Sequence, residues 1–334
     1  MVSDCFSVFN ELDLLEIRLN VLWNVVDKFV FTEATMTHTG KPKPLYYEES
    51  KARFAKYADK IIHIVVDDFP EPPDYYTPQQ VTWMREDWQR NAVKRALKGV
   101  AGPDDLIMIS DVDEIPSPEA VHRCIDNDGV TVFEQLLSNY YLNFVSYTTP
   151  VWRGTKAAKY KVFCDPDTYA KMKPSKYVDE VTNRGATASR LRHVHPDHRI
   201  KKAGWHFSYL GGAKEIVRKI GSIAVEYSNA NNNSEQWVAD VIEKGLDINH
   251  CGRRFFIVPL DERFPEYLLK NRDKYAALIL NGNVDYYRRT RKDRIVCAIR
   301  GWIRKNGAKL IPRPFKQFLY DKVYCKLVKE PIVM

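Results

Sequence analysis

An acidic turn follows a short apolar segment in the middle of the chain. Residues 106–110, LIMIS, read as a buried strand, and Asp111, Asp113 and Glu114 come directly after it. Carboxylates this close raise the cost of ionising one another, so a positive partner is expected beside them. Residues i and i+2 of an extended segment project to the same side, so Asp111 and Asp113 would present their carboxylates together.

This D-x-D spacing suits a hard divalent cation. Mg²⁺ and Mn²⁺ take oxygen ligands, commonly one or two carboxylates together with substrate phosphates. The pattern therefore predicts a clamp for a metal–diphosphate, while the alternative is that the aspartates favour a turn for backbone reasons alone. A calcium loop would need a third acid, a glycine and a distant glutamate; Glu114, Ile115 and Pro116 follow instead. A phosphatase with an aspartate nucleophile would carry a threonine shortly after the second acid, and the sequence has none there.

The elements around this turn alternate between strand and helix over the first 120 residues. Apolar runs predict strands at 4–9, 28–34, 60–68 and 106–110, and 3.6-residue periodicity predicts helices at 10–26, 50–58 and 81–99. Such alternation with continuous apolar strands indicates a parallel sheet covered on both faces. Ligands of these sheets bind beyond the carboxyl ends of the strands, which is where residues 111–114 lie.

The second half of the chain has a different pattern. We expect longer strands of antiparallel type at 130–147 and 157–164, a strand at 203–212 that ends in a Gly pair, and helices at 213–227 and 234–245. No Gly/Ser linker separates the two halves, so one continuous domain over residues 1–280 is expected. Residues 281–334 form a basic, helical C-terminal extension in this prediction.

Charge and composition restrict the possible partners. The net charge is +8, and basic residues far outnumber acids from Tyr286 onward. This favours an anionic partner such as a nucleotide or acidic lipid, although a solvated helical face is the simpler interpretation. The six cysteines are scattered without metal-site or disulfide spacing, which is typical of a reducing compartment. With no apolar run long enough for a membrane span and no signal-peptide pattern, we expect a cytoplasmic protein.

Four segments together resemble a known enzyme family. In order they are DCFSVFNELDLLEIRLN, DKFVFTEATMTHTGKPKPL, SDVDEIP and AGWHFSYLGG, and they resemble successive blocks of glycosyltransferase family 17. The resemblance runs from about residue 4 to 280. It implies a GT-A-type α/β fold, with a Rossmann-like, mostly parallel sheet flanked by helices. It also implies transfer with inversion at the anomeric carbon, with Asp111 and Asp113 holding Mn²⁺ or Mg²⁺ on the donor diphosphate.

The resemblance suggests further residues for the site. A late histidine often adds a metal ligand in such enzymes, and His206 is in the expected place; a hydrogen-bonded strand histidine is the alternative. Arg85 and Arg90 could reach the diphosphate or donor sugar, because guanidinium groups suit phosphate, but surface helix residues need no such role. Glu33 could contact the base or ribose of the donor, or could cap a turn.

An inverting transfer also needs a base near the acceptor hydroxyl, normally a carboxylate. Glu114, beside the clamp, and Glu215, after the Gly pair, are the two candidates. Each has a simpler explanation, as a neighbour of the metal site or as an acid at a helix N-terminus.

The expected activity is therefore metal-dependent, inverting transfer of a sugar, with GlcNAc the expected one, from a UDP-sugar to a glycan or glycolipid acceptor, forming a β-linkage. The basic C-terminus could add a peripheral contact with anionic membrane. One alternative is a metal-dependent phosphoryl or nucleotidyl transferase on nucleic acid, which would bind RNA or DNA in a salt-sensitive manner. No recognisable RNA-binding block is present, so no nucleic-acid partner is expected. A non-catalytic binder of glycans or membranes is the third class.

Overall fold

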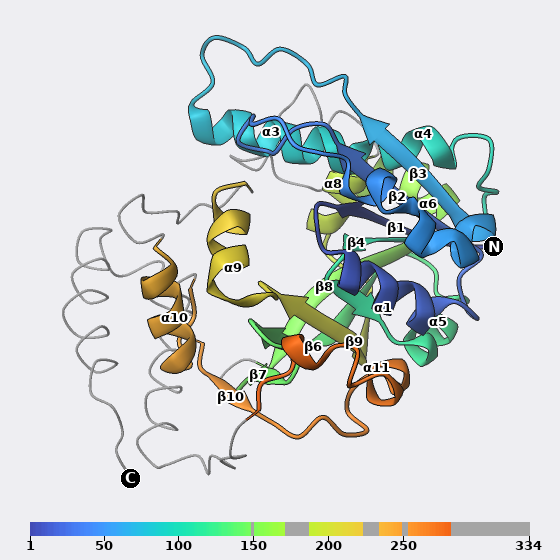
Figure 1. Cartoon of the computed structure of the whole chain (residues 1–334). Coiled ribbons are helices and arrows are strands. Elements are labelled where there is room, and N and C mark those ends of the chain that lie inside the picture. Colours follow the sequence, from blue (N-terminus) through green and yellow to red (C-terminus); the bar gives the residue numbers. More distant parts are fainter. Residues whose placement is uncertain (148–149, 171–186, 223–233, 249–252, 282–334) are drawn as a thin grey trace, which may run out of the picture.

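The computed structural model describes residues 1–147, 150–170, 187–222, 234–248 and 253–281 (Figure 1). The predicted basic extension and its proposed membrane contact lie outside the described residues from residue 282 onward. Among the helices that are described, none is both long and apolar enough to cross a bilayer.

The first half of the chain forms a parallel sheet. Its strands are β1 (Val2–Val8), β2 (Lys28–Ala34), β3 (Ile61–Val66) and β4 (Leu106–Asp111), and every neighbouring pair is parallel. Their spatial order is β3-β2-β1-β4. This is the order of the nucleotide-binding half of a Rossmann-type sheet, and it confirms the predicted α/β fold.

The later strands extend this sheet beyond β4. β8 pairs antiparallel with β4, and β6 then lies between β8, which is antiparallel to it, and β9, which is parallel to it. The strands are β5 (Glu114–Pro116), β6 (Thr131–Asn139), β7 (Phe144–Ser146), β8 (Val151–Lys159), β9 (His198–Ser208) and β10 (Phe255–Ile257). Because β5 pairs with β9, the acidic turn is joined directly to the strand that carries His206.

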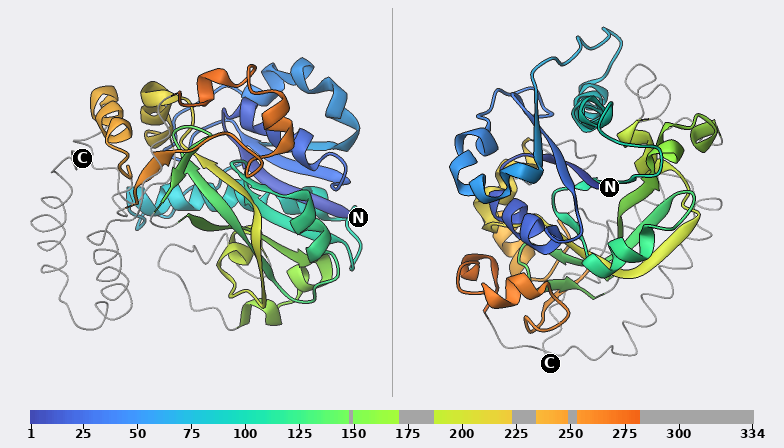
Figure 2. Two further views of the ribbon diagram at one scale, coloured as in Figure 1. Left: turned by 90° about the horizontal axis from the view of Figure 1, so that it is seen from below. Right: turned by 90° about the vertical axis from the view of Figure 1, so that its right-hand side faces the viewer.

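Helices cover both faces of the sheet, as predicted. One face packs against α1, η1 and α5, and the opposite face packs against α4, α6, α7 and α8 (Figures 1 and 2). The helices are α1 (Leu12–Leu22), α2 (Tyr46–Glu49), η1 (Lys51–Lys60), α3 (Pro78–Asn91), α4 (Val93–Leu97), α5 (Pro118–Cys124), α6 (Tyr160–Cys164), α7 (Asp167–Ala170), α8 (Ala188–His193), α9 (Gly212–Ile220), α10 (Glu235–Glu243), α11 (Glu266–Lys270) and η2 (Ala276–Leu278). In Figure 2, α11 lies beside α1, so the end of the described chain returns to its beginning.

Several predicted elements differ from the structure. The helix expected at 81–99 is divided into α3 and α4 at Ala92, and the segment expected as a helix at 50–58 is the 3₁₀ helix η1. The strand expected at 203–212 is β9, which ends at Ser208. The helix expected at 213–227 ends at Ile220, and residues 223–227 of that prediction lie outside the described residues.

Two further strands of the second half also differ from the prediction. The strand expected at 157–164 ends at Lys159, and residues 160–164 form α6, so that part of the prediction is wrong. The strand expected at 130–147 is interrupted after Asn139, because Tyr140 has a φ of 69°. The hydroxyl of Tyr140 donates to the carbonyl of Leu246 and accepts from the amide of Ile248. These distant contacts hold Tyr140 at the break and do not appear in the local sequence pattern.

Candidate active site

A cavity of about 340 Å³ opens at the carboxyl ends of β1 and β4 and at the ends of β6 and β9. Asp111 and Asp113 both line it, together with Arg90 from α3, His206 from β9 and Lys219 from α9. This is the edge of the sheet at which the sequence places the ligand. The predicted clamp therefore faces a space large enough for part of a small ligand.

A buried arginine of α1 holds the backbone of the acidic turn, residues 111–114, through hydrogen bonds. Arg18 is fully buried, and its Nη1 donates to the carbonyl oxygens of Asp111 (2.9 Å), Val112 (3.2 Å) and Glu114 (2.9 Å). Its Nε and Nη2 donate to the carboxylate of Asp4 at 2.7 and 2.6 Å. Arg18 thus ties β1, α1 and the turn together through charge-assisted hydrogen bonds.

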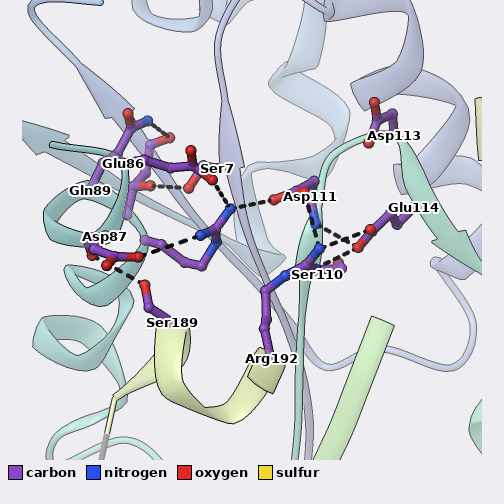
Figure 3. Close-up of polar contacts among 12 residues, drawn as sticks. Ser7, Glu86, Asp87, Gln89, Ser110, Asp111, Asp113, Glu114, Ser189 and Arg192 are labelled. Atoms are coloured by element: carbon purple, nitrogen blue, oxygen red, sulfur yellow. Dashed lines mark hydrogen bonds and ion pairs between the residues drawn. The ribbon is translucent and has the colours of Figure 1, made fainter. Parts of the chain in front are cut away.

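The carboxylate of Asp111 lies between two guanidinium groups. Arg90 Nη2 is 3.0 Å from Oδ1, and Arg192 Nη2 is 3.1 Å from Oδ2. Figure 3 shows Arg192, from α8, reaching Asp111 and Glu114 together. Burial alone would raise the pKa of Asp111, but Arg192 and Arg90 outweigh burial and hold this pKa well below its usual range. The positive partner expected beside the acids is therefore a pair of arginines.

The carboxylate of Asp113 has different partners. Its Oδ1 is 3.4 Å from His206 Nε2, and its Oδ2 is 3.4 Å from Lys219 Nζ. Burial by itself would raise the pKa of Asp113, but Lys219 and His206 outweigh burial and lower it. Residues 112 and 113 form a turn instead of continuing the strand. For this reason the i, i+2 rule for extended chain does not apply, and in Figure 3 Asp113 lies apart from the group around Asp111.

The side chains at the cavity provide part of the ligand set that a divalent ion requires. Asp113 Oδ1 and His206 Nε2 lie 3.4 Å apart and offer an oxygen and a nitrogen ligand at the cavity. The other ring nitrogen, Nδ1, is buried without a hydrogen-bond partner in the described part of the chain. Mg²⁺ and Mn²⁺ accept so few protein ligands when substrate phosphates complete the shell. Asp111 does not join this pair, and no three His, Cys, Asp or Glu side chains of the described residues gather as ligands.

The two arginines predicted on the preceding helix differ in position. Arg90 lines the cavity, as predicted. Arg85 instead donates from Nη1 to the carbonyl of His38 at 3.2 Å. It lies against Gly40, which has a φ of +90°; a Cβ there would be 2.8 Å from Arg85 Nη1. Arg85 therefore supports the loop after β2, and the structure does not favour it as a donor-binding residue.

The predicted donor contact at Glu33 is also not favoured. Glu33 is fully buried at the end of β2, and among the described residues it is not part of the cavity wall. Its Oε1 accepts from the amide of Tyr47 at 2.9 Å, at the start of α2, and its Oε2 is 3.2 Å from His63 Nε2. The alternative given by the sequence, a capping role, describes this environment.

Glu114 is enclosed on all sides. It is fully buried. Its Oε2 accepts hydrogen bonds from Arg192 Nη1 at 2.6 Å and from the amide of Asp111 at 3.0 Å. Its Oε1 accepts from Trp152 Nε1 at 2.7 Å. A general base must reach the proton that it removes. Glu114 has no such access and serves to anchor Arg192 and the turn.

Glu215, the second candidate base, lies in the first turn of α9. Its Oε2 is 3.2 Å from Asn10 Nδ2 and 3.3 Å from Arg218 Nη1. In the described part of the chain, the cavity is lined by two other glutamates, Glu11 and Glu86. The helix N-terminal role is therefore the better account of Glu215.

Three cations that contact the acidic turn are not among the residues predicted from the sequence: Arg18, Arg192 and Lys219. A signal for Arg18 was present, because it falls three residues after Leu15 and four before Leu22, on the apolar stripe of its helix. An arginine on a buried stripe indicates a buried partner. Arg192 and Lys219 carried no comparable signal, since each is one of many basic residues in its region.

Comparisons with known proteins confirm the predicted family over the first part of the chain, and the matched region contains the first three of the four segments; the fourth, AGWHFSYLGG, lies beyond it. The model of glycosyltransferase family 17 matches residues 1–185, which is more than half of the chain. β-1,4-Mannosyl-glycoprotein 4-β-N-acetylglucosaminyltransferase from Homo sapiens is 32% identical over 127 residues, covering 36% of this chain and 22% of the relative. The enzymes of the same name from Rattus norvegicus and Mus musculus are 32% and 31% identical over the same length. The chain thus matches about a fifth of the length of these relatives.

Two solved structures also resemble the chain. Glucosyl-3-phosphoglycerate synthase from Mycobacterium tuberculosis, in complex with phosphoglyceric acid, is 14% identical, with 80% of this chain and 91% of that chain covered and a TM-score of 0.29. A glycosyltransferase involved in glycosylation of the major capsid of PBCV-1 is 11% identical, with 60% and 80% covered and a TM-score of 0.22. These TM-scores are too low to carry an argument. The extent of the family match is sufficient by itself: the chain belongs to glycosyltransferase family 17.

Proposed function

We propose that this protein transfers GlcNAc from UDP-GlcNAc to a glycan or glycolipid acceptor, with inversion and with the help of Mn²⁺ or Mg²⁺. Membership of the family supports glycosyl transfer, and the names of the relatives support GlcNAc as the sugar. The observation that carries the proposal is the position of Asp111 and Asp113. Both line one cavity at the carboxyl edge of a sheet with β3-β2-β1-β4 order, among Arg90, His206 and Lys219.

The charges of the cavity suit a nucleotide diphosphate. Arg90 and Lys219 both line it, and Arg192 joins Arg90 at the carboxylate of Asp111. In the proposed complex Arg90 and Lys219 hold the donor phosphates and stabilise the negative charge that develops on the leaving nucleotide, while Arg192 orients the carboxylate of Asp111. Asp113 and His206 are the residues that would hold the divalent ion, which supplies Lewis-acid stabilisation of the same charge.

Activation of the acceptor falls to a carboxylate of the cavity wall. Glu11 accepts from the amides of Phe9 and Asn10 at 3.1 and 3.2 Å and contacts Lys219 at 3.0 Å, so its oxygens are already engaged. Glu86 pairs with Arg90 through Oε1 at 2.6 Å. We therefore assign the role of general base to Glu86, which takes the proton from the acceptor hydroxyl as the new glycosidic bond forms.

A panel of nucleotide sugars tests the proposal. The protein is mixed with UDP-GlcNAc, UDP-GalNAc, UDP-glucose and GDP-mannose, each with Mn²⁺ and with EDTA, and thermal shift and nucleotide release are measured. We expect the largest shift and UDP release with UDP-GlcNAc and Mn²⁺. The absence of both signals with every sugar would contradict a glycosyltransferase site, and a preference for another sugar would contradict the GlcNAc assignment alone.

A further inference from the structure

The ammonium group of Lys219 lies beside Asp113, one of the two residues that would hold the divalent ion. Its Nζ is 3.4 Å from Asp113 Oδ2 and 3.0 Å from Glu11 Oε1, and it lies 5.7 Å from the centre of the Tyr209 ring. The side chain retains only 17% exposure. The ammonium group is therefore enclosed by two carboxylates and an aromatic face, at the wall of the cavity.

The helix that carries Lys219 is fixed in place. α9 begins after Gly211, which has a φ of +106°, and its residues Ile216 and Ile220 are buried in a hydrophobic cluster. Lys219 precedes Ile220 and faces the cavity instead of the core. Just beyond the helix, the carbonyl of Ser222 accepts from the amide of His38, which joins α9 to the loop after β2. Packing on both sides therefore fixes the backbone from which the Lys219 side chain reaches the cavity.

The charge of Lys219 persists despite its burial. Two carboxylates lie beside the ammonium group, Glu11 at 3.0 Å and Asp113 at 3.4 Å, and opposite charges at this range favour the charged form of the lysine. The contact with Asp113, at 3.4 Å, is longer than the 2.7–2.9 Å typical of charge-assisted hydrogen bonds between oppositely charged groups. Lys219 therefore balances the charge of Asp113, but its ammonium group lies closer to Glu11 than to Asp113.

We propose that Lys219 is an internal cation that competes with the divalent ion for Asp113. An ion held by Asp113 and His206 would be repelled by the ammonium group of Lys219, which contacts the other oxygen of the Asp113 carboxylate. The protein without nucleotide therefore binds the ion weakly. The donor phosphates strengthen the binding of the ion because they attract Lys219 away from Asp113. The inference rests on the proposed function only in taking Asp113 as the metal-binding carboxylate.

The test uses Mn²⁺ alone, without nucleotide. Binding of Mn²⁺ to the full chain is followed by the loss of the free-ion signal in electron paramagnetic resonance. We expect Lys219→Met to tighten Mn²⁺ binding about 10- to 100-fold, because it removes a like charge beside the ion; the size is that of the losses that follow removal of partners of metal ligands. Lys219→Arg keeps the positive charge and should bind Mn²⁺ as the wild type does. Equal affinity in Lys219→Met and the wild type would overturn the inference.

Lys214→Met is the matched control, because Lys214 is an exposed lysine of the same helix. It should leave Mn²⁺ binding unchanged. If Lys219→Met does not fold, judged by circular dichroism, Lys219→Gln provides the same comparison, since its amide still donates to Glu11. The double variant Asp113→Asn with Lys219→Gln should lose the tightened binding; if it retains that binding, the ion lies elsewhere and the inference fails.

The outcome is independent of the test of the proposed function. The Mn²⁺ titration contains no sugar nucleotide, so a failed panel of donors leaves its result unchanged. Conversely, a protein that releases UDP from UDP-GlcNAc but binds Mn²⁺ equally with and without the Lys219 charge would keep its proposed function and lose this inference.

Discussion

Arg18 Nη1 donates to the carbonyl oxygen of Asp111 at 2.9 Å, so the first helix of the chain holds the acidic turn in place. The same guanidinium group forms a fully buried ion pair with Asp4 of β1. Two residues near the N-terminus thereby fix the backbone of a site that begins more than ninety residues later. The side chain of Asp111 remains available to face the cavity.

This arrangement predicts that Arg18→Met is strongly destabilising. Removing one partner of a buried ion pair leaves an uncompensated charge, and the loss is about 3–5 kcal/mol. The free energy of unfolding from urea denaturation measures it. Adding Asp4→Asn should recover part of the loss, while Arg123→Met, at an exposed arginine of α5, should change stability by less than about 0.5 kcal/mol. A single Arg18→Met variant as stable as the wild type would refute the buried network.

Asp113→Asn should remove sugar transfer while the fold persists. Metal-ion stabilisation is worth several kcal/mol, so we expect turnover to fall at least about 100-fold. Transfer assays with Mn²⁺ and with EDTA measure the effect. Asp128→Asn is the control, because the side chain of Asp128 is 87% exposed. Near-normal transfer by Asp113→Asn with EDTA present would show that the metal clamp is wrong.

Glu86, which lines the cavity, should contribute to kcat, whereas Glu215, a base predicted from the sequence, should not. Loss of a general base costs about 10²- to 10⁴-fold, so Glu86→Gln should lower kcat by at least about 100-fold. Glu215→Gln, at the N-terminal turn of α9, should change kcat by no more than about twofold. Measurement of kcat over a range of pH distinguishes loss of a base from loss of binding, since only the former removes the acidic limb of the profile. The opposite ranking of the two variants would return the role to Glu215.

Stability in acid should depend on Glu16, which joins α1 to the end of the described chain. Its oxygens contact Arg53 at 2.5 Å and also Lys274. Burial alone would raise the pKa of Glu16, but Lys274 and Arg53 outweigh burial and lower it. Because the folded value is the lower one, this contribution is complete above the unfolded pKa of about 4.3 and is lost as the pH falls through the folded value.

We therefore expect the unfolding free energy of the wild type to fall between about pH 5 and pH 3. Glu16→Gln should flatten this slope by an amount on the order of 1 kcal/mol. Urea denaturation at a series of pH values measures it, and Glu119→Gln, at an exposed glutamate of α5, is the control. Parallel slopes for Glu16→Gln and the wild type would contradict the linkage.

The sequence alone determined the parallel half of the sheet and the place of the acidic turn. Continuous apolar runs and helical periodicity are local signals, and they predicted β2 (Lys28–Ala34) without error in either boundary. The carboxyl edge follows from strand direction, so the exposure of Asp111 and Asp113 to a cavity could be predicted as well.

Only the tertiary structure decided which charges meet at that edge. Arg192 lies 78 residues from Glu114 along the chain, and Lys219 lies 106 residues from Asp113. No periodicity selects one basic residue among many at such separations. The same reason explains why Glu33 and Glu114, which the sequence offered as site residues, are instead buried among structural partners. Local pattern encodes the strands and helices, whereas the pairing of distant side chains depends on how those elements pack.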